Sequence, residues 1–346
     1  MEFHVGMGRS ETIHEIGPLT RLAEDAGFTH VNFPDQPPLN RDVFLNMAMA
    51  AQSTTRISMG PGIVTPYTYH PAVIANATAT VDELSGGRAF VGIGAGGSAV
   101  MSMGLKPRPM RELREAALFI KRFMAGEEAE FKGGKTHSEW IRRSVPMYIA
   151  VDGPRSHEIA GEFADGVYVQ SVHPEVFEWR KSLIERSALK AGRDPSRIKI
   201  IPSTIVYVTD DRERARREVA PQVASKLRRA FPMWRSSHPD MVALRDRLEE
   251  KDPGLVDELI QVGDRINEVF DEHQHEKVDS PQSRPVTWRL IDYYLLVGSE
   301  DEVCERIEDL RSRGLAGLMP LIYTIEDKRA MMQEIGSRII SRFGSN

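Results

Sequence analysis

Short apolar runs alternate along the chain with longer stretches in which apolar residues recur every three or four positions. The short runs predict strands buried on both faces, and the longer stretches predict amphipathic helices that cover them. The strands are expected at Phe3–Met7, Phe28–Phe33, Arg56–Val64, Ala89–Ile93, Val145–Val151, Asp165–Gln170, Ile198–Val208 and Gly317–Ile322. Helices are expected between them, for example at 72–84, 111–124 and 174–191.

This alternation stops once, between residues 210 and 289, where the chain reads as mostly charged helix without a convincing strand. It resumes at Ser299-Glu-Asp-Glu302, whose spacing is that of a capping box, and a last helix is expected from Glu326 to Arg342. Eight strands alternating with helices predict one α/β domain over residues 1–346, a (β/α)8 TIM barrel with a helical insertion (210–289) after the seventh strand. Ligands of such barrels bind at the C-terminal ends of the strands.

Glycines dominate the end of the fourth strand, where Gly92, Gly94, Gly96 and Gly97 follow one another closely. Without Cβ atoms, such a loop can bring its backbone N–H groups close to a ligand. The spacing also matches G-x-G-x-x-G, but a dinucleotide site needs a second strand and an acidic residue about 20 positions on. A helix is expected there instead, so the alternatives are a ligand-binding loop and a glycine turn without a ligand.

Few acid/base groups stand at the other strand ends. Asp35 and Gln36 follow the second strand and are the candidate catalytic residues, and Asp152 is a weaker second carboxylate. Asp35 could instead cap the loop before the next helix. A glycine-rich rim with so few acids and bases favours a bulky planar cofactor that carries its own chemistry.

Composition excludes several classes of protein. The 346 residues carry a net charge of -5 with acids and bases interspersed, which argues against a nucleic-acid partner. Cys304 is the only cysteine, so disulfides within the chain are excluded and a reducing compartment fits. No apolar run reaches about 18 residues, so we expect no membrane partner and a soluble, cytoplasmic protein. We expect no metal site, because His238, His273 and His275 lie in the charged insertion, where solvated side chains are typical.

Several segments together resemble one family, the luciferase-like flavin and deazaflavin oxidoreductases, and most closely its methylenetetrahydromethanopterin reductase branch. The segments are Asn40–Val43, Gly60–Pro71, Asp82–Ala89 with Gly92–Gly96, Pro146–Pro154 and Glu158–Gly166. The resemblance covers about residues 1–208 and 290–325.

The resemblance implies coenzyme F420, a deazaflavin, or alternatively FMN at the C-terminal mouth of the barrel. It also implies a non-proline cis peptide bond in a bulge of the third strand, at Gly62–Ile63, against one face of the ring. Asp35 would then bond the polar edge of the ring, and the glycine loop and residues 150–153 would hold the phosphate-bearing tail. The cofactor-binding residues so implied are Asp35, Gly62, Ile63, Val64, Thr65, Gly94, Ala95, Gly96, Gly97, Ala150, Val151, Asp152 and Gly153.

The chain departs from several relatives, which carry an acid on the first strand, a histidine after the aspartate and an acid after the glycine loop. Gly6, Gln36 and Gly97 stand at these places, so the resemblance supports the cofactor site rather than a proton-handling site. The first hypothesis is an oxidoreductase that transfers a hydride between F420 and a small organic substrate. The alternatives are an FMN-dependent monooxygenase using oxygen and a cofactor-binding protein without catalysis.

The insertion admits two interpretations, both based on the large apolar groups of Phe231–Trp234 and Trp288. As a lid over the C-terminal mouth, residues 230–289 would select the substrate. As a helical arm, they would form the contact of a homodimer.

Overall fold

The computed structural model of the protein describes residues 1–106, 108–271, 274, 277–322 and 327–344. His273 and His275 lie outside the described residues, as does Glu326 at the expected start of the last helix.

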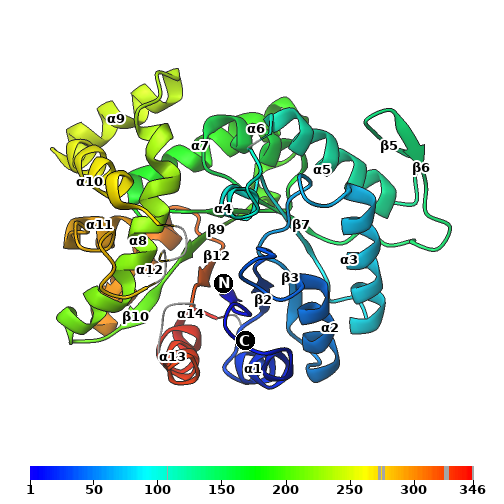
Figure 1. The fold of residues 1–346 in the computed structure, drawn as a ribbon, viewed down its shortest axis with the longest axis horizontal. Helices are drawn as coiled ribbons and strands as arrows, with labels where there is room; N and C mark the ends of the chain where they lie inside the picture. The colour runs from blue at the N-terminus through cyan, green and yellow to red at the C-terminus, as the bar shows by residue number, and fades with distance from the viewer. Residues whose placement is uncertain (107, 272–273, 275–276, 323–326, 345–346) are drawn as a thin grey trace.

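An eight-stranded parallel sheet forms the centre of the molecule (Figure 1). Its strands are β1 (Glu2–Gly6), β2 (His30–Phe33), β3 (Ser58–Pro61), β4 (Val91–Ile93), β7 (Met147–Ala150), β8 (Gly166–Val169), β9 (Lys199–Thr204) and β12 (Gly317–Pro320). They pair in the order β3-β2-β1-β12-β9-β8-β7-β4. Backbone bridges Met59–Ala89 and Val64–Ile93 join the two outer strands. The sheet therefore closes, and the predicted TIM barrel is confirmed.

Helices surround this barrel as the apolar periodicity predicts. They are α1 (Ile13–Asp25), α2 (Val43–Ser53), α3 (Pro71–Ser85), α5 (Met110–Met124), α6 (Pro154–Phe163), α7 (Pro174–Lys190), α12 (Glu300–Ser312) and α13 (Lys328–Glu334), which continues through a π-helical segment (Ile335–Ile340) into α14 (Ser341–Phe343). In α5, the residues at the predicted apolar positions, such as Leu113 and Ala117, are buried. The capping box at the start of α12 is also confirmed.

Two connections differ from the expectation. The fourth strand is followed by a short helix, α4 (Gly97–Ser102), and α5 is followed by a hairpin of β5 (Ala129–Phe131) and β6 (Gly134–Thr136). Lys132 and Gly133, both with positive φ, turn this hairpin. Its strands are three residues long, and β6 is exposed throughout. Such strands lack the apolar run by which a strand is recognised.

The expected seventh strand, 198–208, is wrong as one continuous element. After β9 the chain leaves the barrel, and β10 (Val206–Val208) pairs in parallel with β11 (Leu296–Gly298), a strand that the sequence analysis did not identify. Both segments are buried. An unbroken apolar run does not reveal that a strand has changed its pairing partner.

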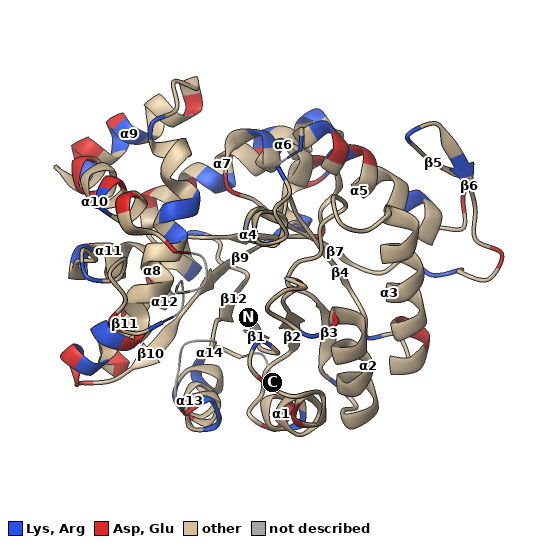
Figure 2. Cartoon of the chain, in the orientation of Figure 1, with Lys and Arg blue, Asp and Glu red and all other residues tan. Residues whose placement is uncertain are grey.

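Between β10 and β11 the chain is helical in its described part, with α8 (Arg212–Trp234), α9 (Pro239–Lys251), α10 (Leu255–Val269) and α11 (Trp288–Tyr294). Trp234 is 1% exposed, and Trp288 is partly buried beneath the guanidinium of Arg212. The apolar groups that motivated an intermolecular contact therefore pack within the chain. Charges of both signs lie on the outer surfaces of α9 and α10 (Figure 2).

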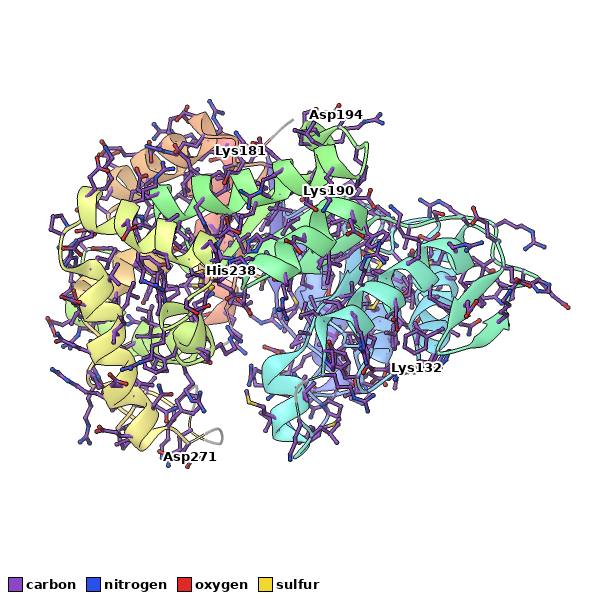
Figure 3. All side chains as sticks on the ribbon, turned by 90° about the horizontal axis from the view of Figure 1, so that it is seen from above. Lys132, Lys181, Lys190, Asp194, His238 and Asp271 are labelled. Carbon is purple, nitrogen blue, oxygen red and sulfur yellow. The ribbon has the colours of Figure 1, made fainter. Side chains whose placement is uncertain are left out.

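The insertion and the hairpin lie on opposite sides of the barrel. Figure 3 marks the insertion by His238 and Asp271 and the hairpin by Lys132. None of the helices in the described ranges is both long and apolar enough to cross a membrane.

Candidate active site

Asp35 lies just beyond the C-terminal end of β2 and is 5% exposed. Its Oδ1 accepts a hydrogen bond from the Tyr69 hydroxyl at 3.3 Å, whereas its Oδ2 accepts none from the described residues. Burial raises the pKa of the Asp35 carboxyl from its ordinary value to about 6. A buried carboxylate oxygen without a donor is costly, so the site is prepared for a ligand that supplies one.

The bulge after β3 joins the end of β2 to the glycine loop after β4. Gly62 N donates to Phe33 O at 2.6 Å, and Gly94 N donates to Val64 O at 3.1 Å. The peptide bond Gly62–Ile63 is cis, as the resemblance implies. Thr65, fully buried, donates its hydroxyl to Ala95 O at 3.3 Å. Residues 62–65 and 94–97 thus form one continuous surface at the mouth of the barrel.

Glycine is required at particular points of this surface. Gly96 has a φ of +65°, which side chains disfavour. A Cβ on Gly94 would lie 3.2 Å from the Ile63 side chain and 3.3 Å from Ala150 Cβ, so the bulge, the glycine loop and the end of β7 meet here. A Cβ on Gly97 would meet no atom within 4 Å. The loop is therefore closely packed at Gly94, and open space remains beside Gly97.

The segment after β7 is fixed by its own hydrogen bonds. Val151 N donates to Tyr168 O at 3.0 Å, and Asp152 N donates to the hydroxyl oxygen of Ser156 at 3.0 Å. Gly153 is the N-cap of α6 and, like Gly97, has no atom within 4 Å of an added Cβ. The start of α6 therefore has open space beside Gly153, and the positive end of the helix dipole favours anions there.

Sequence analysis missed the buried residues that hold this segment from behind. Arg180 donates to Val151 O and Asp152 O, each at 3.3 Å, and also to the Nε2 atom of His157. The Nδ1 atom of His157 bonds Gly153 O at 2.8 Å, and burial lowers the pKa of this histidine to about 3. The sequence does mark Arg180, because a charged residue occupies a position within the apolar stripe of α7.

Gln36, the other candidate catalytic residue, is buried next to Asp35, and its Oε1 accepts from the Arg9 guanidinium at 3.3 Å. An amide held in this way can orient a ligand, but it cannot exchange a proton as a carboxylate can. Asp35 is the group in this arc whose pKa favours proton exchange near neutrality.

The opposite, N-terminal end of the barrel contains a cluster that sequence analysis also missed. Glu2, His4 and His30 place possible metal-ligating atoms within 4.8 Å of one another. However, the two imidazole rings stack at 4.0 Å with an interplanar angle of 3°, so their in-plane lone pairs cannot converge on one ion. Glu2 also accepts from Lys199 Nζ at 2.6 Å. The arrangement is that of an ion-paired core, not of a metal site.

A cavity of about 810 Å³ opens at this same end, between α5 and the beginnings of β7 and β9. Several cations that line it already have partners: Arg143 pairs with Asp82, Lys199 pairs with Glu2, and Lys121 donates to a backbone carbonyl. Since ligands of TIM barrels bind at the other end, we place the candidate site at the C-terminal mouth despite the size of this cavity.

Comparison with known proteins agrees with this placement. The family model described as luciferase-like monooxygenase matches residues 1–317. The chain is 29% identical to a 5,10-methylenetetrahydromethanopterin reductase of Archaeoglobus fulgidus, with 99% of both chains covered. It is 28% identical to an F420-dependent hydroxymycolic acid dehydrogenase of Mycobacterium tuberculosis, covering 79% of this chain and 80% of the relative.

The fold is also similar to a solved structure, the coenzyme F420-dependent tetrahydromethanopterin reductase of Methanopyrus kandleri. The TM-score is 0.80 at 26% identity, with 99% of each chain covered. The family match extends over most of the chain. The chain belongs to the luciferase-like monooxygenase family.

Proposed function

We propose that the protein is an F420-dependent oxidoreductase that transfers a hydride between the deazaflavin and a small organic substrate at the C-terminal mouth of the barrel. The relatives named above support this assignment through their F420-dependent activities. The observation on this chain that carries it is the buried Asp35 carboxylate, whose Oδ2 accepts no hydrogen bond from the described residues beside an open glycine loop.

The residues of the mouth fit the two chemically different ends of such a cofactor. The polar edge of the ring would meet Asp35, and the bulge Gly62–Thr65 would support one face of the ring. The loop 94–97 and the segment 150–153 would hold the anionic tail through backbone N–H groups and the start of α6. When bound, the deazaflavin would supply or accept the hydride, and the protein would orient the substrate over the ring.

Asp35 is also the candidate acid or base. A carboxyl with a pKa of about 6 is mostly ionised at pH 7 but keeps a protonated fraction of roughly a tenth, so it can exchange a proton with a bound group. The hydrogen bond from Tyr69 fixes the orientation of the Asp35 carboxyl. Gln36 lies beside Asp35 and is held by a hydrogen bond from Arg9. We assign the role of orienting residue to Gln36.

The insertion is proposed as the wall on the substrate side. Helix α8 reaches the barrel rim, where Lys226 bonds the end of β8. Trimming α9 and α10 should then leave F420 affinity largely intact and reduce turnover. A homodimer remains a prediction that light scattering of the purified protein would test.

The decisive experiment titrates the purified protein with F420 and, separately, with FMN, following the visible spectrum of each. We expect saturable binding of F420 and oxidation of its reduced form by an organic acceptor without oxygen uptake. Tight FMN binding with oxygen consumption, and no binding of F420, would instead make the protein a monooxygenase. Binding of F420 without turnover over a broad panel of acceptors would support a non-catalytic binding protein.

A further inference from the structure

Gln170 is the first residue after β8, at the C-terminal mouth of the barrel. Side chains alternate along a strand, and Tyr168, two positions earlier, lies inside, where its hydroxyl contacts the Asn32 amide and His4. Gln170 comes two positions after Tyr168 and is half-buried, and continuing this alternation past the end of β8 gives it the same side as Tyr168. In the order of the barrel strands, β7 separates β8 from the glycine loop after β4.

Two cations hold the oxygen of this amide. Lys226 Nζ donates to Gln170 Oε1 at 2.8 Å, and Arg229 Nη2 donates to the same oxygen at 3.3 Å. An ammonium or guanidinium group can only donate, so the oxygen of the amide must face them. The amide NH2 group is thereby turned away from both cations. Both come from α8, so the insertion sets the orientation of a side chain of the barrel.

Burying the side chain of Lys226, which holds the Gln170 amide, costs folding free energy. It is 2% exposed, and its second hydrogen bond goes to the backbone oxygen of Ser203 at 2.7 Å. Burial drives its pKa well below the ordinary value. No ion pair of Lys226 with a carboxylate is found among the described residues. A buried lysine bound only to neutral oxygens is an expensive way to stabilise a helix, which indicates another role.

We propose that Lys226 is a positioning residue that fixes the Gln170 amide so that its NH2 group donates a hydrogen bond to the substrate. The inference rests on the proposed function. When a hydride reaches the carbon of a C=O or C=N bond, the electron pair of that bond moves onto the oxygen or nitrogen, which later takes a proton from water. The amide N–H stabilises this atom as it gains electron density, and Lys226 strengthens the donor by polarising the amide from behind.

The discriminating variant is Gln170→Glu. A carboxylate of the same shape keeps both bonds to α8 and makes them charge-assisted, so the fold should be at least as stable. It removes the N–H donor, so kcat/KM for the carbonyl or imine compound that the wild type reduces fastest with reduced F420 should fall about a hundredfold. The dissociation constant of F420 should change less than about twofold. A variant as active as the wild type would overturn the proposal, because a structural role requires only the two bonds.

Lys226→Met is the companion variant, with Arg228→Gln as a control that removes a cation from the same helix without contacting Gln170. We expect Lys226→Met to lower kcat/KM about tenfold with F420 affinity retained. Side-chain amide NMR gives a readout without any substrate. The Gln170 resonances are identified by their loss in Gln170→Glu. They should report an ordered side chain in the wild type and a mobile one in Lys226→Met. An equally ordered amide in both would refute the positioning role. Absence of F420 binding by the wild type would refute the proposed function instead.

Discussion

The two ends of the barrel are built in opposite ways. At the N-terminal end, large and charged side chains fill the interior: the rings of His4 and His30 stack, Tyr148 stacks on Tyr168, and Glu2 is ion-paired. At the C-terminal end, the loops after β4 and β7 are rich in glycine and alanine, with Gly94–Gly97 after β4 and with Ala150 and Gly153 at the end of β7. An end whose polar groups satisfy one another has little left for a ligand, whereas an end with few side chains and one unsatisfied carboxylate oxygen can receive one.

The largest effect is expected from filling the open end. A Cβ on Gly62 would lie 2.7 Å from Asn32 Cβ, closer than real Cβ contacts, and the branched side chain of Gly62→Val would extend the clash. The bulge would have to shift, and F420 binding should weaken by more than about a hundredfold. Circular dichroism should show the barrel retained. Normal binding by a folded variant would exclude the bulge from the cofactor site.

Asp35→Asn should separate stability from binding at the same end. Ionising a buried carboxyl with a pKa of about 6 costs free energy at neutral pH, so the variant should gain about 1–3 kcal/mol of stability without cofactor. Loss of the charge-assisted hydrogen bond should weaken F420 binding about tenfold or more. Thermal unfolding and spectroscopic titration at pH 7.5 measure the two effects. Unchanged affinity would make Asp35 a structural residue.

The same carboxyl predicts a pH dependence. Its pKa in the folded protein, about 6, exceeds the ordinary value of 3.8, so the folded state binds more protons between these values. The free energy of unfolding of the cofactor-free protein should therefore gain a downward slope as pH rises from about 4 to about 6. Asp35→Asn should lack this component. Equal slopes in denaturant titrations of both proteins would contradict the raised pKa.

A substitution at the closed end should affect stability alone. Tyr168→Phe removes the hydroxyl that accepts from Asn32 Nδ2 at 2.7 Å inside the barrel. The buried amide then lacks this acceptor, and the cost should be about 1–3 kcal/mol. F420 affinity should stay within about twofold. A large loss of affinity at unchanged stability would show that the two ends are functionally coupled.

The smallest effect concerns Glu2. Burial acts to raise its pKa, but hydrogen bonds from His4 and Lys199 outweigh it and lower the pKa to about 2. Its stabilising contribution is present above the ordinary value of 4.5 and is lost as pH falls toward 2. Glu2→Gln should therefore cost about 1 kcal/mol at pH 7 and little at pH 2.5. An equal loss at both values would exclude the ion pair as its cause.

Much of the open end was predictable because backbone geometry requires particular residues there. Glycines at 94, 96 and 97 and the aspartate after β2 mark strand ends directly in the sequence, and the resemblance implied the cis bond at Gly62. The residues behind them were harder to find. Arg180 and Lys226 lie on helices that are distant in sequence from the strand ends they support. Their only sequence signal is a cation at a position within the apolar stripe of a helix. Pairing between strands, as for β10 and β11, leaves no local signal.

The pairing of β10 with β11 has a consequence for how the protein can diversify. The chain enters the insertion from one strand of this ribbon and returns through the other, and neither strand belongs to the barrel sheet. The helices between them can be lengthened, exchanged or lost without breaking a backbone hydrogen bond between two strands of the barrel. The insertion can therefore vary while the barrel keeps its cofactor site, so proteins with the same barrel can differ in their substrates.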